Sequence, residues 1–292
     1  IAAVVVVALI TAGAGLLLYM PVEIEVKDTF KVGDKHTLVT EKETKYTIKE
    51  VSGDASSFKI DDDGYEDTRA YVDLKEDIES VVLFDEDTTG MTTEEKRIDT
   101  DFGKRDCIVY TYTNSGFTLK YYVGKTNGII YKEVFETDTY TMTNELKKSS
   151  IFTESSTEFK VKEAKDLKVN DSLVSTRNNK ATREIEEVKP AEGENPEEYR
   201  FKEDTAFYTR DEVIGNLLLI VPESMLEDAE LKGKETVKIS LGRVACDVYT
   251  IMHLGIEYTA YISNGILVKY EAEGLAIYWS YSNLIVKKNA LF

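Results

Sequence analysis

The pattern of hydrophobic and polar positions divides the chain into two unlike parts. Ile1–Met20 contains no charged side chain, whereas the rest of the chain alternates short apolar and polar runs. An uncharged run of this length forms a helix about 30 Å long, which matches the hydrocarbon core of a bilayer. Pro21 follows and ends such a helix. The pattern therefore predicts a transmembrane anchor helix over residues 1–21 and places residues 22–292 on the extracytoplasmic side.

One pattern occurs twice after this run. Leu167–Asp171 repeats Phe30–Asp34 at an offset of 137 residues (171 − 34), and Cys246–Thr250 repeats Cys107–Thr111 at an offset of 139 (246 − 107). A nearly constant offset through separate blocks predicts two copies of one structural unit. A polar, Ser-rich stretch between the copies marks their boundary. The predicted β-rich repeat units are residues 22–150 and residues 151–292.

The interior of each unit reads mainly as β-structure. Segments rich in Tyr, Val, Ile and Thr flank Asn127-Gly128 and Asn264-Gly265, and Asn-Gly is typical of tight hairpin turns. A four-stranded antiparallel meander is therefore expected to close each unit. Short helices are expected to begin at Asp73 and Thr209, each of which precedes a Glu by three residues.

These elements predict an α+β class that is mainly β. The expected architecture is an N-terminal apolar helix followed by two tandem copies of a curved antiparallel β-sheet module. Each module is expected to carry one or two short helices on one face.

Composition and charge exclude several classes of function. The chain carries 54 acidic and 36 basic side chains, a net charge of −18, which is the opposite of a nucleic-acid binder. Two Cys and two His leave little material for a metal site, and no nucleophile, phosphate-loop or zinc motif is present. We therefore expect no enzyme activity, no catalytic residue, no cofactor and no metal.

A few residues remain as candidates for modification or binding. Cys107 and Cys246 occupy equivalent positions and either form a disulfide or, the interpretation we favour, are small buried side chains. Asn170 begins a glycosylation sequon, Asn-Asp-Ser. His36 is expected on the surface, as is His253. The acidic run at residues 61–67 lacks calcium-loop spacing and is interpreted as a solvated turn.

Tyrosines crowd the first meander. They form either an aromatic patch for contact with another molecule or ordinary cross-strand packing, and the sequence leaves both open. The residues are Tyr110, Tyr112, Tyr121, Tyr122, Tyr131 and Tyr140.

Two stretches and the repeated turn carry a resemblance to a known group of proteins. The stretches read GKRDCIVYTY at residues 103–112 and YYVGKTNGIIYK at residues 121–132, and the turn is KVGD at residues 31–34. The chain resembles uncharacterised single-pass membrane-anchored archaeal surface proteins with duplicated β-rich modules. This resemblance covers most of residues 22–292 and implies a cell-surface location, but no activity. The curved sheet is also similar in outline to the half-barrels of bacterial lipoprotein carriers, at fold level only.

The expected function is that of a membrane-anchored extracytoplasmic cell-surface protein with a structural or protein-interaction role. One alternative is a pilin-like subunit of an extracellular filament, with Ile1–Met20 in the filament core. The other is a carrier or sensor of a lipid or hydrophobic ligand, which requires an apolar cavity of about 300 to 1,000 Å³. The expected partners are the membrane or neighbouring subunits, contacted through Ile1–Met20, and an unidentified protein, but no nucleic acid.

Overall fold

The structure, a computed structural model, describes residues 21–202, 204–217, 221, 226–227, 229–253 and 256–288. The predicted anchor helix at Ile1–Met20 lies outside these residues. Within the described ranges, no helix is both long enough and apolar enough to cross a membrane. The predicted single-pass membrane placement and the anchor-led fold are therefore corrected, because this part of the chain holds no membrane-spanning helix.

The mainly β character is confirmed, and the contacts form two compact units. Unit 1 comprises Ile1–Val39 and Ala181–Phe292, and unit 2 comprises Thr40–Lys180. Two long strands, β2 (Lys35–Val51) and β12 (Ser172–Lys189), contribute to both units. The predicted boundary between residues 150 and 151 thus falls inside unit 2.

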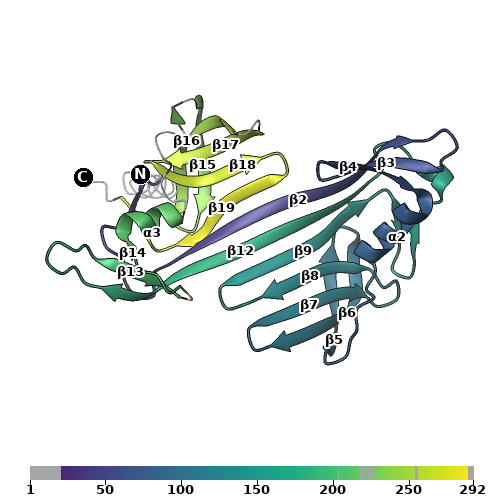
Figure 1. The fold of residues 1–292 in the computed structure, drawn as a ribbon, viewed down its shortest axis with the longest axis horizontal. Helices are drawn as coiled ribbons and strands as arrows, with labels where there is room; N and C mark the ends of the chain where they lie inside the picture. The colour runs from purple at the N-terminus through teal and green to yellow at the C-terminus, as the bar shows by residue number, and fades with distance from the viewer. Residues whose placement is uncertain are drawn as a thin grey trace, which may run out of the picture. The chain divides into compact units, whose positions relative to one another are not determined.

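Unit 2 is a meander joined to a hairpin and covered by one helix (Figure 1). The meander and the two long strands follow the order β2-β12-β9-β8-β7-β6-β5, and β2 also pairs with β3, which pairs with β4. The elements are β3 (Ser57–Asp62), β4 (Tyr65–Ala70), α2 (Tyr71–Val82), β5 (Thr92–Thr100), β6 (Gly103–Asn114), β7 (Phe117–Gly124), β8 (Ile130–Glu136), β9 (Tyr140–Ser149), β10 (Phe152–Glu154), β11 (Phe159–Val161) and the 3₁₀ turn η1 (Ala164–Asp166).

Unit 1 repeats this plan. Its order is β15-β16-β17-β18-β19-β2, with β12 pairing β13 and β13 pairing β14, and β1 pairs separately with β20. The elements are β1 (Ile24–Val26), β13 (Glu198–Phe201), β14 (Tyr208–Thr209), α3 (Arg210–Asn216), β15 (Glu230–Ile239), β16 (Gly242–His253), β17 (Ile256–Ser263), β18 (Ile266–Ala272), β19 (Leu275–Ser282) and β20 (Ile285–Lys287).

The two sequence repeats exchange their first segments instead of folding in tandem. In unit 1, Gly33 N–H donates to Ile185 C=O and Ile185 N–H donates to Asp34 C=O, both at 2.8 Å. In unit 2 the equivalent residues make the same two bonds with the repeats exchanged: Asn170 N–H donates to Ile48 C=O, and Ile48 N–H donates to Asp171 C=O. Each repeat therefore supplies the opening turn that completes the meander of the other repeat, which corrects the expected tandem architecture.

The two cores show the same exchange. Phe30, from the first repeat, is 2% exposed in the core of unit 1, where its ring lies 5.2 Å from that of Tyr199. Its counterpart Leu167, from the second repeat, is 3% exposed in the core of unit 2. Burying an apolar side chain of this size contributes about 2 kcal/mol, so each repeat stabilises the other.

Local sequence explains the turns, but only one of the two predicted helix starts. Asn264 and Gly265 have φ of 51° and 77°, the left-handed pair that a two-residue hairpin needs. Thr209 and Glu212 form the predicted capping box of α3, which is confirmed. The predicted start at Asp73 is wrong, because α2 begins at Tyr71, after Ala70, without a side-chain cap.

Candidate functional site

The two cysteines lie in different units. Cys107 belongs to unit 2 and Cys246 to unit 1, and both are free thiols that are 1% exposed. Burial raises the pKa of each thiol to about 11, so neither is a thiolate near neutral pH. Their arrangement matches that of small buried side chains on strands.

The other sequence candidates lie apart from one another. His36 is 1% exposed, so the prediction that it lies on the surface is wrong. The side chain of His253 lies outside the described part of the chain. Asn170 is exposed in a turn with φ of 73°, and its glycosylation stays a prediction.

The acidic run forms the turn of the β3–β4 hairpin, where its carboxylates meet nearby cations. Asp61 accepts from Lys49 at 2.8 Å, and Asp63 pairs with Lys42. Among the described residues, no group of His, Cys, Asp and Glu could hold a metal ion.

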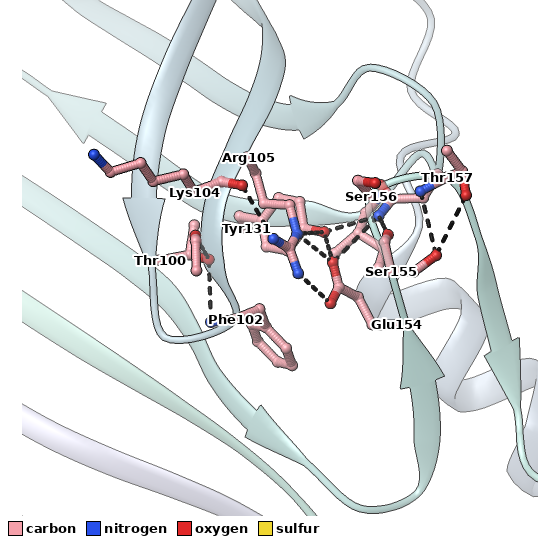
Figure 2. Close-up of polar contacts among 12 residues, drawn as sticks. Thr100, Phe102, Lys104, Arg105, Tyr131, Glu154, Ser155, Ser156 and Thr157 are labelled. Atoms are coloured by element: carbon pink, nitrogen blue, oxygen red, sulfur yellow. Dashed lines mark hydrogen bonds and ion pairs between the residues drawn. The ribbon is translucent and has the colours of Figure 1, made fainter.

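A buried polar cluster joins β6, β8 and the β10–β11 hairpin of unit 2 (Figure 2). Arg105 donates to both carboxylate oxygens of Glu154, at 2.6 and 2.8 Å, and the Tyr131 hydroxyl donates to the same carboxylate. Asn127 donates to the Tyr131 hydroxyl at 2.8 Å and to Ser155 C=O at 2.7 Å. These hydrogen bonds fasten the hairpin to the meander, and Tyr131 also lines a cavity near β5.

The charge states of this cluster follow from its contacts. Burial raises the pKa of Tyr131 to about 12, and its hydrogen bond to Glu154 adds to that shift. Burial alone would raise the pKa of Glu154, but the hydrogen bonds from Arg105 and Tyr131 outweigh it and lower that pKa. The pair of Arg105 and Glu154 therefore stays ionised near neutral pH. Valines occupy the corresponding positions in unit 1: Val244 (105 + 139) and Val268 (131 + 137).

The opposite side of the meander carries a surface that we call the aromatic face. Its side chains share one face because they are cross-strand partners: Tyr110 faces Tyr121, which faces Glu133, and Tyr112 faces Leu119, which faces Phe135. None of them belongs to the buried core cluster of unit 2, and all are half-buried. The aromatic face comprises Phe84, Tyr110, Tyr112, Phe117, Leu119, Tyr121, Phe135, Tyr140 and Met142.

The end of helix α2 delivers one ring to this face. Phe84 N–H donates to Gly128 C=O at 3.0 Å, which fixes the segment after the helix to the β7–β8 turn. The Phe84 ring then stacks on Tyr110, with centroids 4.5 Å apart, and lies 5.3 Å from Tyr121. A second group of rings continues along the strands, since Phe117 lies 5.8 Å from Tyr112 and 5.4 Å from Phe135.

Two adjoining cavities lie beside the last turns of α2, and the second extends to β8 and β9. They measure about 280 and 230 Å³ and share Thr44, Val81, Leu173 and Ser175 as lining residues. The first is also lined by Asp62, Arg69 and Asp77, and the second by Glu133, Glu145 and Arg177. A third cavity of about 310 Å³ lies near β5 and is lined largely by Lys, Asp and Glu. All three combine apolar floors or walls with charged side chains.

The tyrosine-rich pattern indicated this region but not its arrangement. Tyr122 and Tyr131 do not belong to the aromatic face: the first lies opposite Val109 on the other side of the sheet, and the second lies in the buried core. Phe84 was missed because its place depends on how α2 ends, a tertiary feature.

Comparisons with known proteins give no relative from which a role could be taken. No family model, no curated protein and no solved structure matches the chain. The resemblance to archaeal surface proteins therefore stays a prediction.

Proposed function

We propose that this protein is a non-catalytic interaction protein that binds a partner on the aromatic face of unit 2. The observation that carries the proposal is a row of half-buried Tyr, Phe, Leu and Met side chains outside the core of the unit. Aromatic side chains with a polar tip are enriched at protein interfaces, because they bury a large area with little loss of conformational freedom.

Neighbouring residues on β7 provide a matched test of this proposal. Leu119 lies on the aromatic face, whereas Lys120 points to the other side, where it binds Glu136 at 2.9 Å. The wild type and the two variants are each immobilised and exposed to the same protein extract. Partner proteins that the wild type retains should be lost from Leu119→Ser and retained by Lys120→Ser. The measurement is quantitative mass spectrometry of the retained proteins. The proposal fails if no protein depends on Leu119, or if both variants release the same set.

Carriage of a hydrophobic ligand is a second candidate. The cavities beneath α2 favour it, since Ile78, Val81 and Leu173 line the cavity of about 280 Å³. Their charged walls and modest volumes suit an extended acyl chain less well than a purely apolar cavity does. Titration with a fluorescent fatty acid tests this function: weaker binding by Leu173→Trp, which places a larger side chain at a residue that lines both cavities, would support it. Equal binding by the variant would contradict it.

A further inference from the structure

The aromatic face carries an uneven distribution of charge. Glu133 lies directly opposite Tyr121 on the neighbouring strand, and Glu86 follows Phe84 by two residues. Burial raises the pKa of the Tyr121 phenol, and the negative charges of Glu133 and Glu86 raise it further. Glu133 accepts a hydrogen bond from Asn144 at 2.7 Å. Neither carboxylate has a basic partner among the residues that the structure describes.

Rings and unpaired carboxylates together select one kind of partner. A Lys or Arg side chain is attracted to the face of an aromatic ring, and its stem covers apolar surface while its charge meets carboxylates. An acidic segment would meet repulsion from Glu133 and Glu86. Arg177 on strand β12 donates to Asn144 at 2.9 Å, and Asn144 donates to Glu133, so this cation lies near the β9 edge of the face. Strand β12 lies three strand spacings, or about 14 Å, from β7, which carries Tyr121.

We propose that a basic segment of a partner protein docks on the aromatic face, with a Lys or Arg side chain over Tyr121 between Glu86 and Glu133. Apolar residues of the same segment cover Leu119 and Phe135 in the neighbouring row. The inference rests on the proposed function and names the chemistry of its partner. The net charge of −18 adds a long-range attraction that accelerates the encounter. Unit 1 has Tyr270 (133 + 137) where unit 2 has Glu133, so the inference concerns unit 2 alone.

The test uses a labelled ten-residue peptide with two arginines among apolar residues, and a second peptide with glutamates in place of the arginines. Fluorescence anisotropy with the full chain should show binding of the basic peptide, weakened by added salt, and little binding of the acidic one. Glu133→Gln removes one carboxylate charge but keeps an acceptor for Asn144. We expect this variant to bind the basic peptide about tenfold more weakly.

Glu94→Gln is the matched control. It removes the same charge from β5, opposite Val109 on the other side of the sheet, so it changes the long-range attraction equally. We expect its affinity for the basic peptide to stay within about twofold of the wild type. Equal weakening by both variants, absence of binding to the basic peptide, or equal binding of the acidic peptide would overturn the inference. If a partner is still released by Leu119→Ser in that case, the face binds a partner of other chemistry and the proposed function stands.

Discussion

His36 is a buried polar residue whose ring nitrogens have no hydrogen-bond partner among the described residues. It is 1% exposed in unit 1, and its ring lies 6.4 Å from that of Trp279. Burial lowers its pKa from 6.5 to about 4, and no charged neighbour contributes to that shift. The equivalent residue of the other repeat, at 36 + 137, is the buried Leu173. Protonation of His36 therefore opposes the folded state of unit 1.

Replacing His36 by Leu should remove part of the acid sensitivity of unit 1. Because the folded pKa lies below the unfolded value, the stabilisation is complete above pH 6.5 and is lost as the pH falls toward 4. The full loss is about 3 kcal/mol in the wild type and is absent in His36→Leu. Urea unfolding at both ends of this range, followed by the fluorescence of the single Trp, measures the difference.

The acid sensitivity of the wild type must be compared with that of His36→Leu, because other groups titrate in the same range. Carboxylates with lowered pKa, such as Glu154, also lose their stabilising contribution as the pH falls below their unfolded value. Only the difference between wild type and His36→Leu isolates the imidazole. Identical pH dependence in the two proteins would show that His36 is not the titrating group.

Glu154 anchors the buried cluster of unit 2, and its removal should be costly. Its side chain is 4% exposed and that of Arg105 is 15% exposed, so Glu154→Ala leaves a buried cation without its carboxylate. We expect the free energy of unfolding to fall by about 3 kcal/mol, because the Arg105 charge is left buried without its partner. Adding Arg105→Val removes that charge and should restore part of the stability. Calorimetry of the single and double variants measures both.

An exposed pair supplies the control for that prediction. Glu66 pairs with Lys59 at 2.9 Å, but these side chains are 53% and 36% exposed. Glu66→Ala should therefore cost less than about 1 kcal/mol. A cost for Glu154→Ala no greater than that for Glu66→Ala would mean that the buried cluster does not hold the hairpin.

At the scale of elements, the two helices begin differently. Thr209 accepts a hydrogen bond from Glu212 N–H at the start of α3, whereas Ala70 offers no side-chain acceptor at the start of α2. Thr209→Ala should destabilise the protein by about 1 kcal/mol, and Ala70→Ser should stabilise it by about 0.5 kcal/mol. Ala70 already has the extended backbone of a capping residue, with φ of −68° and ψ of 156°. Denaturant unfolding monitored by circular dichroism checks the opposite signs, and two changes of the same sign would contradict this account.

Elements that depend on local chemistry were predictable from the sequence. The Asn-Gly hairpins and the Thr209 capping box require only neighbouring residues, so their signals are present in short stretches. The aromatic face required more, because a shift of pairing register by one residue moves a whole strand to the other side of the sheet. The predicted crowd of tyrosines included Tyr131, yet the structure places it in the core next to Glu154.

At the scale of the whole molecule, the sequence showed the repeat but not that the two copies exchange their opening segments. A constant offset fixes that Gly33 and Asn170 are equivalent, and it is equally compatible with tandem and exchanged units. The choice between them depends on where β2 and β12 continue after their opening turns, and both strands run on from one unit into the other. The burial of His36 also depends on how the units are completed. The apolar Leu173 at the equivalent position of the other repeat was a sequence signal for it.

The exchange predicts that neither repeat folds alone. A protease site inserted between Ser156 and Thr157, in the turn of the β10–β11 hairpin, allows the folded chain to be cut there. The upstream piece then carries the opening turn at Gly33, which unit 1 needs, and the downstream piece carries Asn170, which unit 2 needs. The pieces should co-elute in gel filtration after cutting, lose their β-type circular dichroism when separated in denaturant, and recover it only when mixed. A downstream piece that refolds alone as a monomer with native Trp279 fluorescence would contradict the exchange, because its core would then be complete without Phe30.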